Sequence, residues 1–318
     1  MPITWRKRLA VVKMETTYGQ ASADMTGATI LEVVAMEGGS PYAGNTVDRE
    51  RMRDGLGAFE QVNTGPYVER TIRVPLAGSG TKGEAPAYGP LLRACGLSEA
   101  IDTTTVGSES VTYAPVSDAF ESLEMWWVED SQQQHMTGVR GTASITTDSQ
   151  GLPYIQFQLR GLYQRPEAAG DASVATKGAQ AKEIPVNKQN SQFSIDSKPA
   201  RLSSFSLDLG IEYPYRGLVN YEGIEITNRQ VSGSANIEAP DLATVDYFAK
   251  VESHSGQTLV PVTLTHGTTG GNIVEISGQQ VQLNSISPSE NQGIMHYDLG
   301  LRFLPSAAED DDVSITFT

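Results

Sequence analysis

Cysteine and clustered histidine are nearly missing from this sequence. The single cysteine, Cys95, excludes a disulfide within the chain. It lies in a short apolar stretch with no histidine near it, so we expect a buried structural thiol and not a nucleophile. The four histidines, His135, His254, His266 and His296, have neither HxxxH nor HExxH spacing. The sequence therefore predicts no zinc site, and we expect these histidines on the surface or at strand ends.

Long apolar runs are also missing. After the basic residues 5–8 (WRKR), the apolar residues 9–12 are interrupted by Lys13, which is too soon for a signal peptide. No other stretch approaches the roughly 18 consecutive apolar residues of a membrane helix. We therefore expect a protein that is made and kept in the cytoplasm, or leaves it by lysis, and that has no membrane partner.

Positive charge is scarce. The chain has 23 Lys and Arg against 38 Asp and Glu, a net charge of −15. Only residues 6–8 and 49–53 come close to basic clusters. Proteins that bind nucleic acid by neutralising phosphates present clustered Lys and Arg, so this composition argues against that class.

Patterns of catalytic and ligand-binding residues are incomplete. Residues 78–83 (GSGTKG) spell GxGxxG, but Pro75 and the alternation before it do not fit a buried parallel strand, and Pro86 delays the helix. No Gly-Lys-Ser/Thr or GxSxG pattern occurs, and the acidic run 309–312 lacks the spacing of an EF-hand. We interpret 78–83 as a flexible polar loop and 309–312 as a solvated turn, and expect no catalytic residue, cofactor or metal. A nucleotide-dependent oxidoreductase is a remaining alternative.

What the sequence does have is short alternation of apolar and polar residues. The clearest examples are residues 71–74, 155–159, 205–209 and 223–227. This period of two predicts half-buried strands of mainly antiparallel sheets. The adjacent Trp126 and Trp127 face opposite sides of such a strand, so we expect one in the core and the other at an interface or on the surface.

Helical patterns are few. Residues 86–97 carry Leu91, Leu92 and Ala94, and residues 241–253 have apolar residues at helical spacing after Asp241, a plausible N-cap. These two segments predict about one helix in each half of the chain.

The two halves are separated by a change in composition. Residues 166–192 are small and polar with no apolar periodicity, which predicts a linker between a domain at 1–165 and a second at 193–318. A weak repeat supports this division. Residues 150–162 (QGLPYIQFQLRGL) resemble 292–301 (QGIMHYDLGL), and in each half a strand, 72–77 or 235–239, precedes the expected helix.

Several stretches resemble one known family. They are residues 9–19 (LAVVKMETTYG), 77–99 (AGSGTKGEAPAYGPLLRACGLSE), 111–125 (VTYAPVSDAFESLEM), 264–274 (LTHGTTGGNIV) and 299–305 (LGLRFLP). Together they span nearly the whole chain. They are similar to the tail tube proteins of siphophages, the long-tailed bacteriophages, particularly those of the transposable Pseudomonas-type phages.

The resemblance implies a mainly β fold with two tandem tail-tube-like β-sandwich or half-barrel domains, each with one flanking α-helix. It implies a major tail tube subunit that stacks as rings into a hollow tube in the virion tail, conducting the genome without specific DNA binding. The expected partners are further copies of the chain, as trimeric pseudo-hexameric rings, the tape measure protein in the lumen, and the tail terminator and distal tail proteins at the ends. A tail terminator, another virion ring protein and a β-rich adhesin are the alternatives.

The resemblance also suggests which residues take part in assembly. Residues 36–65, with Arg49, Arg51 and Arg53, are the candidate loop between rings, and an ordinary mobile surface loop is the other interpretation. On the strand 71–77 the apolar residues Ile72, Val74 and Leu76 are expected to face the helix, with Arg73 and Pro75 on the other side. By the repeat, Ile237 matches Val74. The lumen candidates are therefore Arg73, Asn236 and Glu238.

Overall fold

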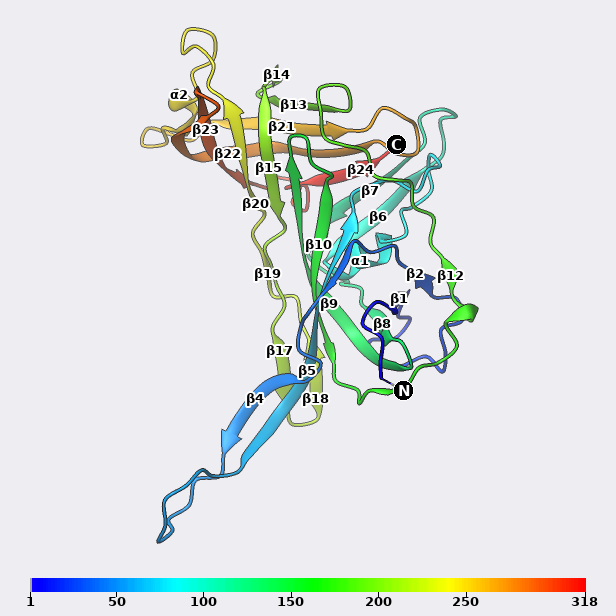
Figure 1. Cartoon of the computed structure of the whole chain (residues 1–318). Coiled ribbons are helices and arrows are strands. Elements are labelled where there is room, and N and C mark those ends of the chain that lie inside the picture. Colours follow the sequence, from blue (N-terminus) through cyan, green and yellow to red (C-terminus); the bar gives the residue numbers. More distant parts are fainter. Residues whose placement is uncertain (1) are drawn as a thin grey trace.

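Alternating residues build most of the chain into strands. In the computed structural model, which describes residues 2–318, 24 β-strands are joined by two short α-helices and one 3-10 turn. The expected mainly β fold is thus confirmed. Figure 1 shows a tall molecule with an arm at one end and α2 at the other.

The first half contains one long bent strand. The first part of β9 (Gln132–Asp148) pairs with β8 (Leu123–Glu129), which pairs with β1 (Arg8–Met14). The rest of β9 pairs with β10 (Tyr154–Leu162), which pairs with β5 (Gln61–Pro75). Gly138 has φ +58, and a Cβ there would lie 2.9 Å from the ring of Tyr18. This glycine allows β9 to pass between the two sheets.

The second half has a bent strand of the same kind. The first part of β22 (Val274–Asn291) pairs with β21 (Leu259–His266), and its last part pairs with β23 (Ile294–Phe303). Strand β20 (Ser232–Glu238) pairs with β23 on one side and β15 (Leu202–Asp208) on the other. In each half a turn joins the bent strand to the next strand. The turn contains Gln150 in the first half and Gln292 in the second, and both residues have positive φ.

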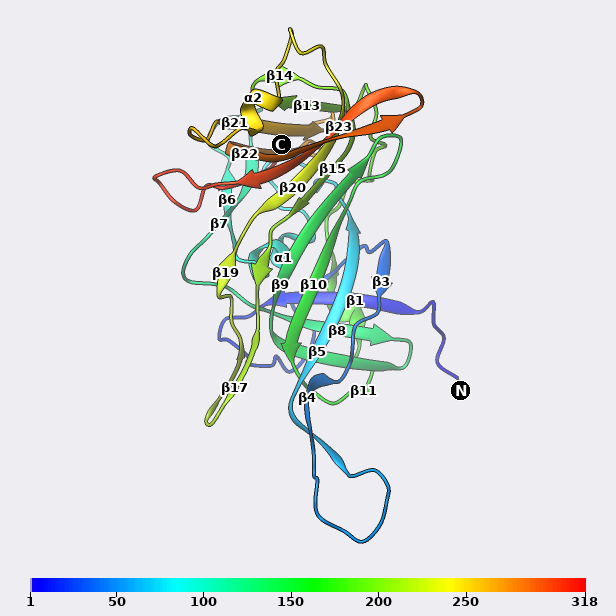
Figure 2. The ribbon, with the colours of Figure 1, turned by 90° about the vertical axis from the view of Figure 1, so that its left-hand side faces the viewer.

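The two halves share sheet and core. The end of β9 pairs with β15, so the order β5–β10–β9–β15–β20–β23–β22 is continuous, and Figure 2 shows its first five strands side by side. The last strand, β24 (Ser314–Phe317), pairs with β7 (Ser110–Pro115) of the first half. One hydrophobic cluster includes Phe157 and Leu299 alike. The division at 1–165 and 193–318 stays a prediction.

The remaining elements are short. They are β2 (Thr29–Ile30), β3 (Ala35–Glu37), β4 (Ala43–Asp48), β6 (Leu97–Asp102), β11 (Glu167–Ala168), η1 (Ala172–Val174), β12 (Thr176–Lys177), β13 (Ser191–Ile195), β14 (Lys198–Pro199), β16 (Ile211–Glu212), β17 (Tyr215–Leu218), β18 (Tyr221–Ile224) and β19 (Asn228–Arg229). The expected strands at 71–74 and 155–159 lie inside β5 and β10, and 205–209 follows β15 to Asp208. The expectation for 223–227 was wrong beyond Ile224, because the chain leaves the β17–β18 hairpin there.

Residues 166–192 run along the first half. Strand β12 pairs in parallel with β2, and the amide of Ala181 donates to the carbonyl of Gly78 at 2.8 Å. Small residues of this segment (Ala169, Ala172, Ala175) cover Trp126, while Trp127 lies in the main core. Both tryptophans are therefore buried. The outward-facing one is covered by the segment expected to be a linker.

Both helices are shorter than expected. Helix α1 (Gly89–Ala94) packs Leu91, Leu92 and Ala94 into the core and ends before Gly96, whose φ of +71 suits a residue that stops a helix. Helix α2 (Phe248–Val251) is a single turn. Asp241 caps only a preceding turn, accepting a hydrogen bond from the amide of Ala243. Leu242 and Phe248 are 58% and 43% exposed, whereas Val245 and Tyr247 contact the core, so the apolar residues do not share the single face that a longer helix would bury.

Candidate functional site

The continuous sheet has one buried face and one polar outer face. Because side chains alternate along each strand, the register aligns outer residues of successive strands in rows. One row, read across six strands from β5 to β23, is Arg73, Gln156, Ser144, Asp208, Ser232 and Arg302. The outer face therefore extends without interruption from the first half of the chain to the second.

All three residues expected at the lumen lie on this outer face. Arg73 belongs to β5, while Asn236 and Glu238 belong to β20. The pairing of the strands agrees with the proposed repeat: Val74 lies opposite Ile155 and Ile237 lies opposite Tyr297, at matching places in the two aligned sequences. Arg73 and Asn236 therefore occupy equivalent positions.

The three side chains have polar partners. Arg73 forms an ion pair with Glu37 at 2.7 Å and donates a hydrogen bond to Gln156 at 3.1 Å. Asn236 donates to Asp298 at 2.6 Å, and Glu238 pairs with Arg201. As expected, Ile72 and Val74 lie on the buried side. Pro75, expected on the other side together with Arg73, is buried. Gln180 of the docked segment donates a hydrogen bond to its carbonyl at 3.1 Å.

Hydroxyl and carboxylate groups dominate the outer face. The hydroxyl residues on β9, β15 and β20 are Ser144, Thr146, Ser204, Ser206, Ser232 and Ser234, and the exposed carboxylates are Asp148, Asp208 and Asp298. Two arginines end the row: Arg73 forms an ion pair with Glu37, and Arg302, opposite Ser232, is exposed. Such a surface is well hydrated and presents few cations to the phosphates of DNA.

Residues 36–65 include a hairpin arm. Strand β4 pairs with the first part of β5, and residues 49–60 form a tip that lies away from the rest of the molecule in Figure 1. Arg49 pairs with Glu60 at 3.1 Å, and Arg53 donates to the carbonyls of Gly55 and Ala58. Arg51 is exposed. Two of the three arginines thus shape the tip itself.

The sequence analysis missed the apolar residues of the tip. Met52 and Leu56 are completely exposed, and the ring of Phe59 packs under the guanidinium of Arg53 at 4.4 Å. Fully exposed apolar side chains on a projecting hairpin are typical of a surface that another molecule covers. The arginines on either side of Met52 and the glycines on either side of Leu56 could have indicated this in the sequence.

A second hairpin was missed altogether. Strands β17 and β18 form a hairpin at the base of the arm, where the rings of Tyr215 and Tyr67 lie 5.2 Å apart (Figure 1). Its tip exposes Leu218 and Val219 and turns at Asn220, with φ +67. This hairpin precedes β20 as the arm precedes β5. The signal in the sequence was Asn220, a residue type that favours turns, between the strand-favouring Tyr215 and Tyr221.

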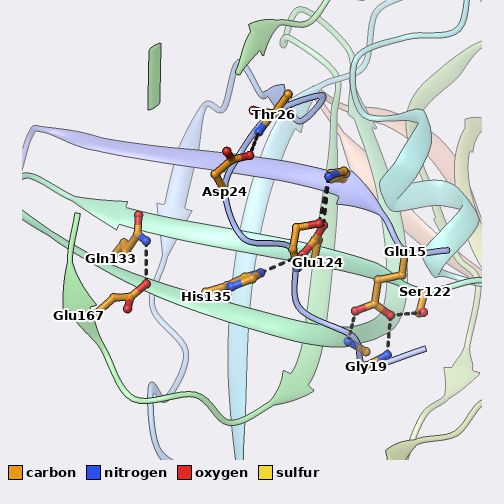
Figure 3. Close-up of polar contacts among 12 residues, drawn as sticks. Glu15, Gly19, Asp24, Thr26, Ser122, Glu124, Gln133, His135 and Glu167 are labelled. Carbon is orange, nitrogen blue, oxygen red and sulfur yellow. Dashed lines mark hydrogen bonds and ion pairs between the residues drawn. The ribbon is translucent and has the colours of Figure 1, made fainter. Parts of the chain in front are cut away.

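A buried polar cluster joins β8 and β9 to the loop around Ser22 (Figure 3). Glu124 accepts hydrogen bonds from the amide and hydroxyl of Ser22, at 2.8 and 2.5 Å, and lies 3.0 Å from Nε2 of His135. The ring of His135 stacks on Trp126 at 4.4 Å. Burial lowers the pKa of His135, and burial raises the pKa of Glu15 nearby. Because these groups contact one another, the cluster fixes the chain around Ser22 and does not present a free base.

Other candidate sites are closed. In the Gly78 loop, the amide of Gly78 donates to Asn272 and the amide of Gly80 to the carbonyl of Gly271, so the 267–273 turn fills the place of a phosphate. Cys95 is buried, and burial raises the pKa of its thiol. Within residues 2–318 there is no group of three or more potential metal ligands. Nor does the described part of the chain contain a helix long and apolar enough to cross a membrane.

Comparison with models of protein families identifies the family of this chain. A model of the phage tail tube proteins matches residues 4–318, and the chain belongs to this family. Comparison with curated proteins gives no match. Membership makes the chain a structural subunit of the virion tail that self-assembles into a tube.

Proposed function

We propose that the chain is the major tail tube subunit of a siphophage, of the transposable Pseudomonas-type, and that it catalyses no reaction. The uninterrupted polar face from β5 to β23 carries this proposal. It forms the wall of the lumen, where DNA meets mainly hydroxyl groups and carboxylates, and where Arg73 is paired with Glu37. The net charge of −15 adds repulsion of phosphates, so the genome passes without being bound.

Three chains close each ring. The proposal rests on the equivalent positions of Arg73 and Asn236 and on the recurrence of a bent strand, a Gln-Gly turn and a last strand in each half. Two tube domains per chain, at 1–165 and 193–318, then give a ring with true threefold and approximate sixfold symmetry, whose head-to-tail interfaces are of two kinds.

The arm bridges successive rings. Its exposed Met52 and Leu56 provide the apolar contact, and Arg49, Arg51 and Arg53 lie beside them. The β17–β18 hairpin, with Leu218 and Val219 exposed, adds a second and shorter contact. The tape measure protein occupies the lumen before DNA does, and the tail terminator and distal tail proteins bind the two ends of the stack.

Electron microscopy of the purified protein, together with native mass measurement, tests these proposals. Hollow tubes built from rings of three chains are expected. Rings of six chains would show that one elaborated tube domain had been taken for two. Isolated rings that never stack would favour a tail terminator or another virion ring protein, and particles without a central hole would favour an adhesin.

A further inference from the structure

A buried arginine lies on the core side of β5. Arg70 lies on the same side as Val68, Ile72 and Val74, opposite Leu159 of β10, and is only 7% exposed. Every other inward position of β5 between residues 68 and 74 is apolar. A buried cation is costly unless it is paired with an anion, so this position requires an explanation.

Arg70 has little to compensate its burial. One nitrogen of its guanidinium donates to Oε1 of Gln134 at 2.6 Å, and the group lies over the ring of Trp127 at 4.6 Å. Burial lowers the pKa of Arg70 to about 10, although the negative charge of Glu129 acts to raise it. Gln134 is neutral, and its amide nitrogen is already used by the carbonyls of Pro41 and Gln164. Among residues 2–318 the guanidinium of Arg70 is hydrogen-bonded to the neutral Gln134 and forms no ion pair with a carboxylate.

Two buried donors here have no acceptor. Nε of Arg70 and Nε1 of Trp127 make no hydrogen bond to any described residue. Both side chains line one pocket, a cavity of about 320 Å³ with Arg8, Glu129 and Pro41 also in its wall. Buried donors without acceptors are rare in native proteins and indicate a missing partner. A partner that accepts from a guanidinium and an indole N–H together is an oxygen anion.

The local charge suits an anion. Arg8 and Arg70 both line the pocket against one carboxylate, Glu129, in a chain whose net charge is −15. The guanidinium of Arg8 is held in place over the ring of Trp5 at 4.0 Å and donates to the carbonyl of Met36 at 3.2 Å. A cationic pocket in an acidic subunit attracts the acidic surface of another copy of that subunit.

We propose that this pocket binds a carboxylate, and that its occupant in the tube is an acidic side chain from a second copy of the chain. The pocket wall includes Gly39 and Pro41, where the arm leaves the body. In Figures 1 and 2 the arm and α2 lie at opposite ends of the molecule. Beside α2, Asp241, Asp246 and Glu252 are exposed. Stacking of rings, on which this inference rests, brings these opposite ends together and supplies the carboxylate.

The central test replaces Arg70→Met. Removing an unpaired buried cation is expected to leave the melting temperature of the isolated chain unchanged or higher, while the concentration needed for tube assembly rises roughly tenfold or more. Trp127→Phe, which removes only the indole N–H and ring edge, is expected to act in the same direction. Unchanged assembly in both variants would overturn the proposal. So would a loss of stability in the isolated chain that accounts for the loss of assembly.

A matched variant is Glu129→Gln in the same pocket. If an incoming carboxylate competes with Glu129, neutralising Glu129 strengthens assembly. If instead the charge of Glu129 stabilises the buried Arg70, the variant destabilises the isolated chain and the proposal fails. Sodium acetate, compared with chloride at equal ionic strength, is expected to raise the assembly concentration of the wild type and not of Arg70→Met. Acetate binding to the chain without any effect on assembly would indicate a free carboxylate as the ligand and overturn the assignment to a second copy.

The source of the carboxylate has its own test. Neutralising Asp241, Asp246 and Glu252 together should weaken assembly, and combining this change with Arg70→Met should add little further. Fully additive effects would overturn the assignment to the α2 end. If the wild type formed no rings or tubes, the proposed function would fail as well, whereas normal tubes from Arg70→Met would overturn the pocket alone.

Discussion

In the first half of the chain, the strand that carries Arg73 is preceded by the long arm. In the second half the equivalent strand, with Asn236, is preceded only by the short β17–β18 hairpin. The strands themselves pair in the same way in both halves. The difference shows that the structure of the shared sheet and the length of the added hairpins are determined by different interactions. Packing fixes the strands, while contacts outside the chain are free to differ between two otherwise equivalent positions.

The largest expected effect is the loss of the arm. Asp48 and Gln61 are paired partners, so replacing residues 49–60 by Asn-Gly would close the hairpin with a tight turn. We expect a folded chain whose unfolding free energy changes by less than about 1 kcal/mol, because the tip is exposed, but which no longer forms long tubes. Electron microscopy and circular dichroism measure both. Leu218→Ser with Val219→Ser is the matched change in the other hairpin and should shorten tubes without abolishing them. Normal tubes after the arm deletion would contradict its bridging role.

Core truncations compare the halves directly. Phe157 and Leu299 occupy equivalent positions and are 0% and 1% exposed. Replacing either by Ala should lower the free energy of unfolding by about 2–5 kcal/mol. Because β9 pairs with β15 across the halves, we expect one cooperative transition in urea, shifted by either variant. Two transitions, each sensitive to only one variant, would mean that the halves fold independently.

Charge on the outer face should control DNA affinity. The wild type is expected to bind DNA more weakly than about 10⁻⁶ M at physiological salt. Replacing Asp148, Asp208 and Asp298 by Lys puts three cations on the exposed face and should produce measurable binding that falls steeply with salt. The matching Asn variants, which remove charge without adding cations, should bind little. Fluorescence anisotropy distinguishes these cases, and tight binding by the wild type would be incompatible with a non-adhesive lumen.

The smallest expected effect concerns pH, since each half holds a buried histidine whose pKa is lowered. Burial lowers the pKa of His135 and of His266 below the usual value of 6.5. The unfolded chain then binds protons that the folded chain does not, so stability present above pH 6.5 falls as the pH drops through the folded pKa. Each histidine should contribute to this loss. His135→Gln and His266→Gln should each reduce the slope of stability against pH relative to wild type, and parallel slopes would count against the burial effect.

The sequence predicted the strands best where a single face is buried. Residues 71–74 and 155–159 alternate because their inward side chains fill one core, and the polar side followed directly from that. The short α2 was not predictable, since Leu242, Val245 and Phe248 share one face by pattern, but of these only Val245 packs against the core. Docking of 166–192 depends on Trp126. The pattern alone placed one of the two tryptophans at an interface or on the surface, without distinguishing Trp126 from Trp127. Arg70 interrupts the apolar pattern of β5, and no rule of alternation predicts a buried cation there.

The pairing of β9 with β15 has a mechanical consequence. Five backbone pairs, from Asp148 opposite Ser204 to Ser144 opposite Asp208, join the halves in register. Such a seam resists shear because many hydrogen bonds must break together. In a stacked tube, the wall within each ring would then be stiff, and bending of a long tail would be taken up between rings, where slender arms can swing. A tail of this design would bend mainly between rings, while each ring keeps its shape.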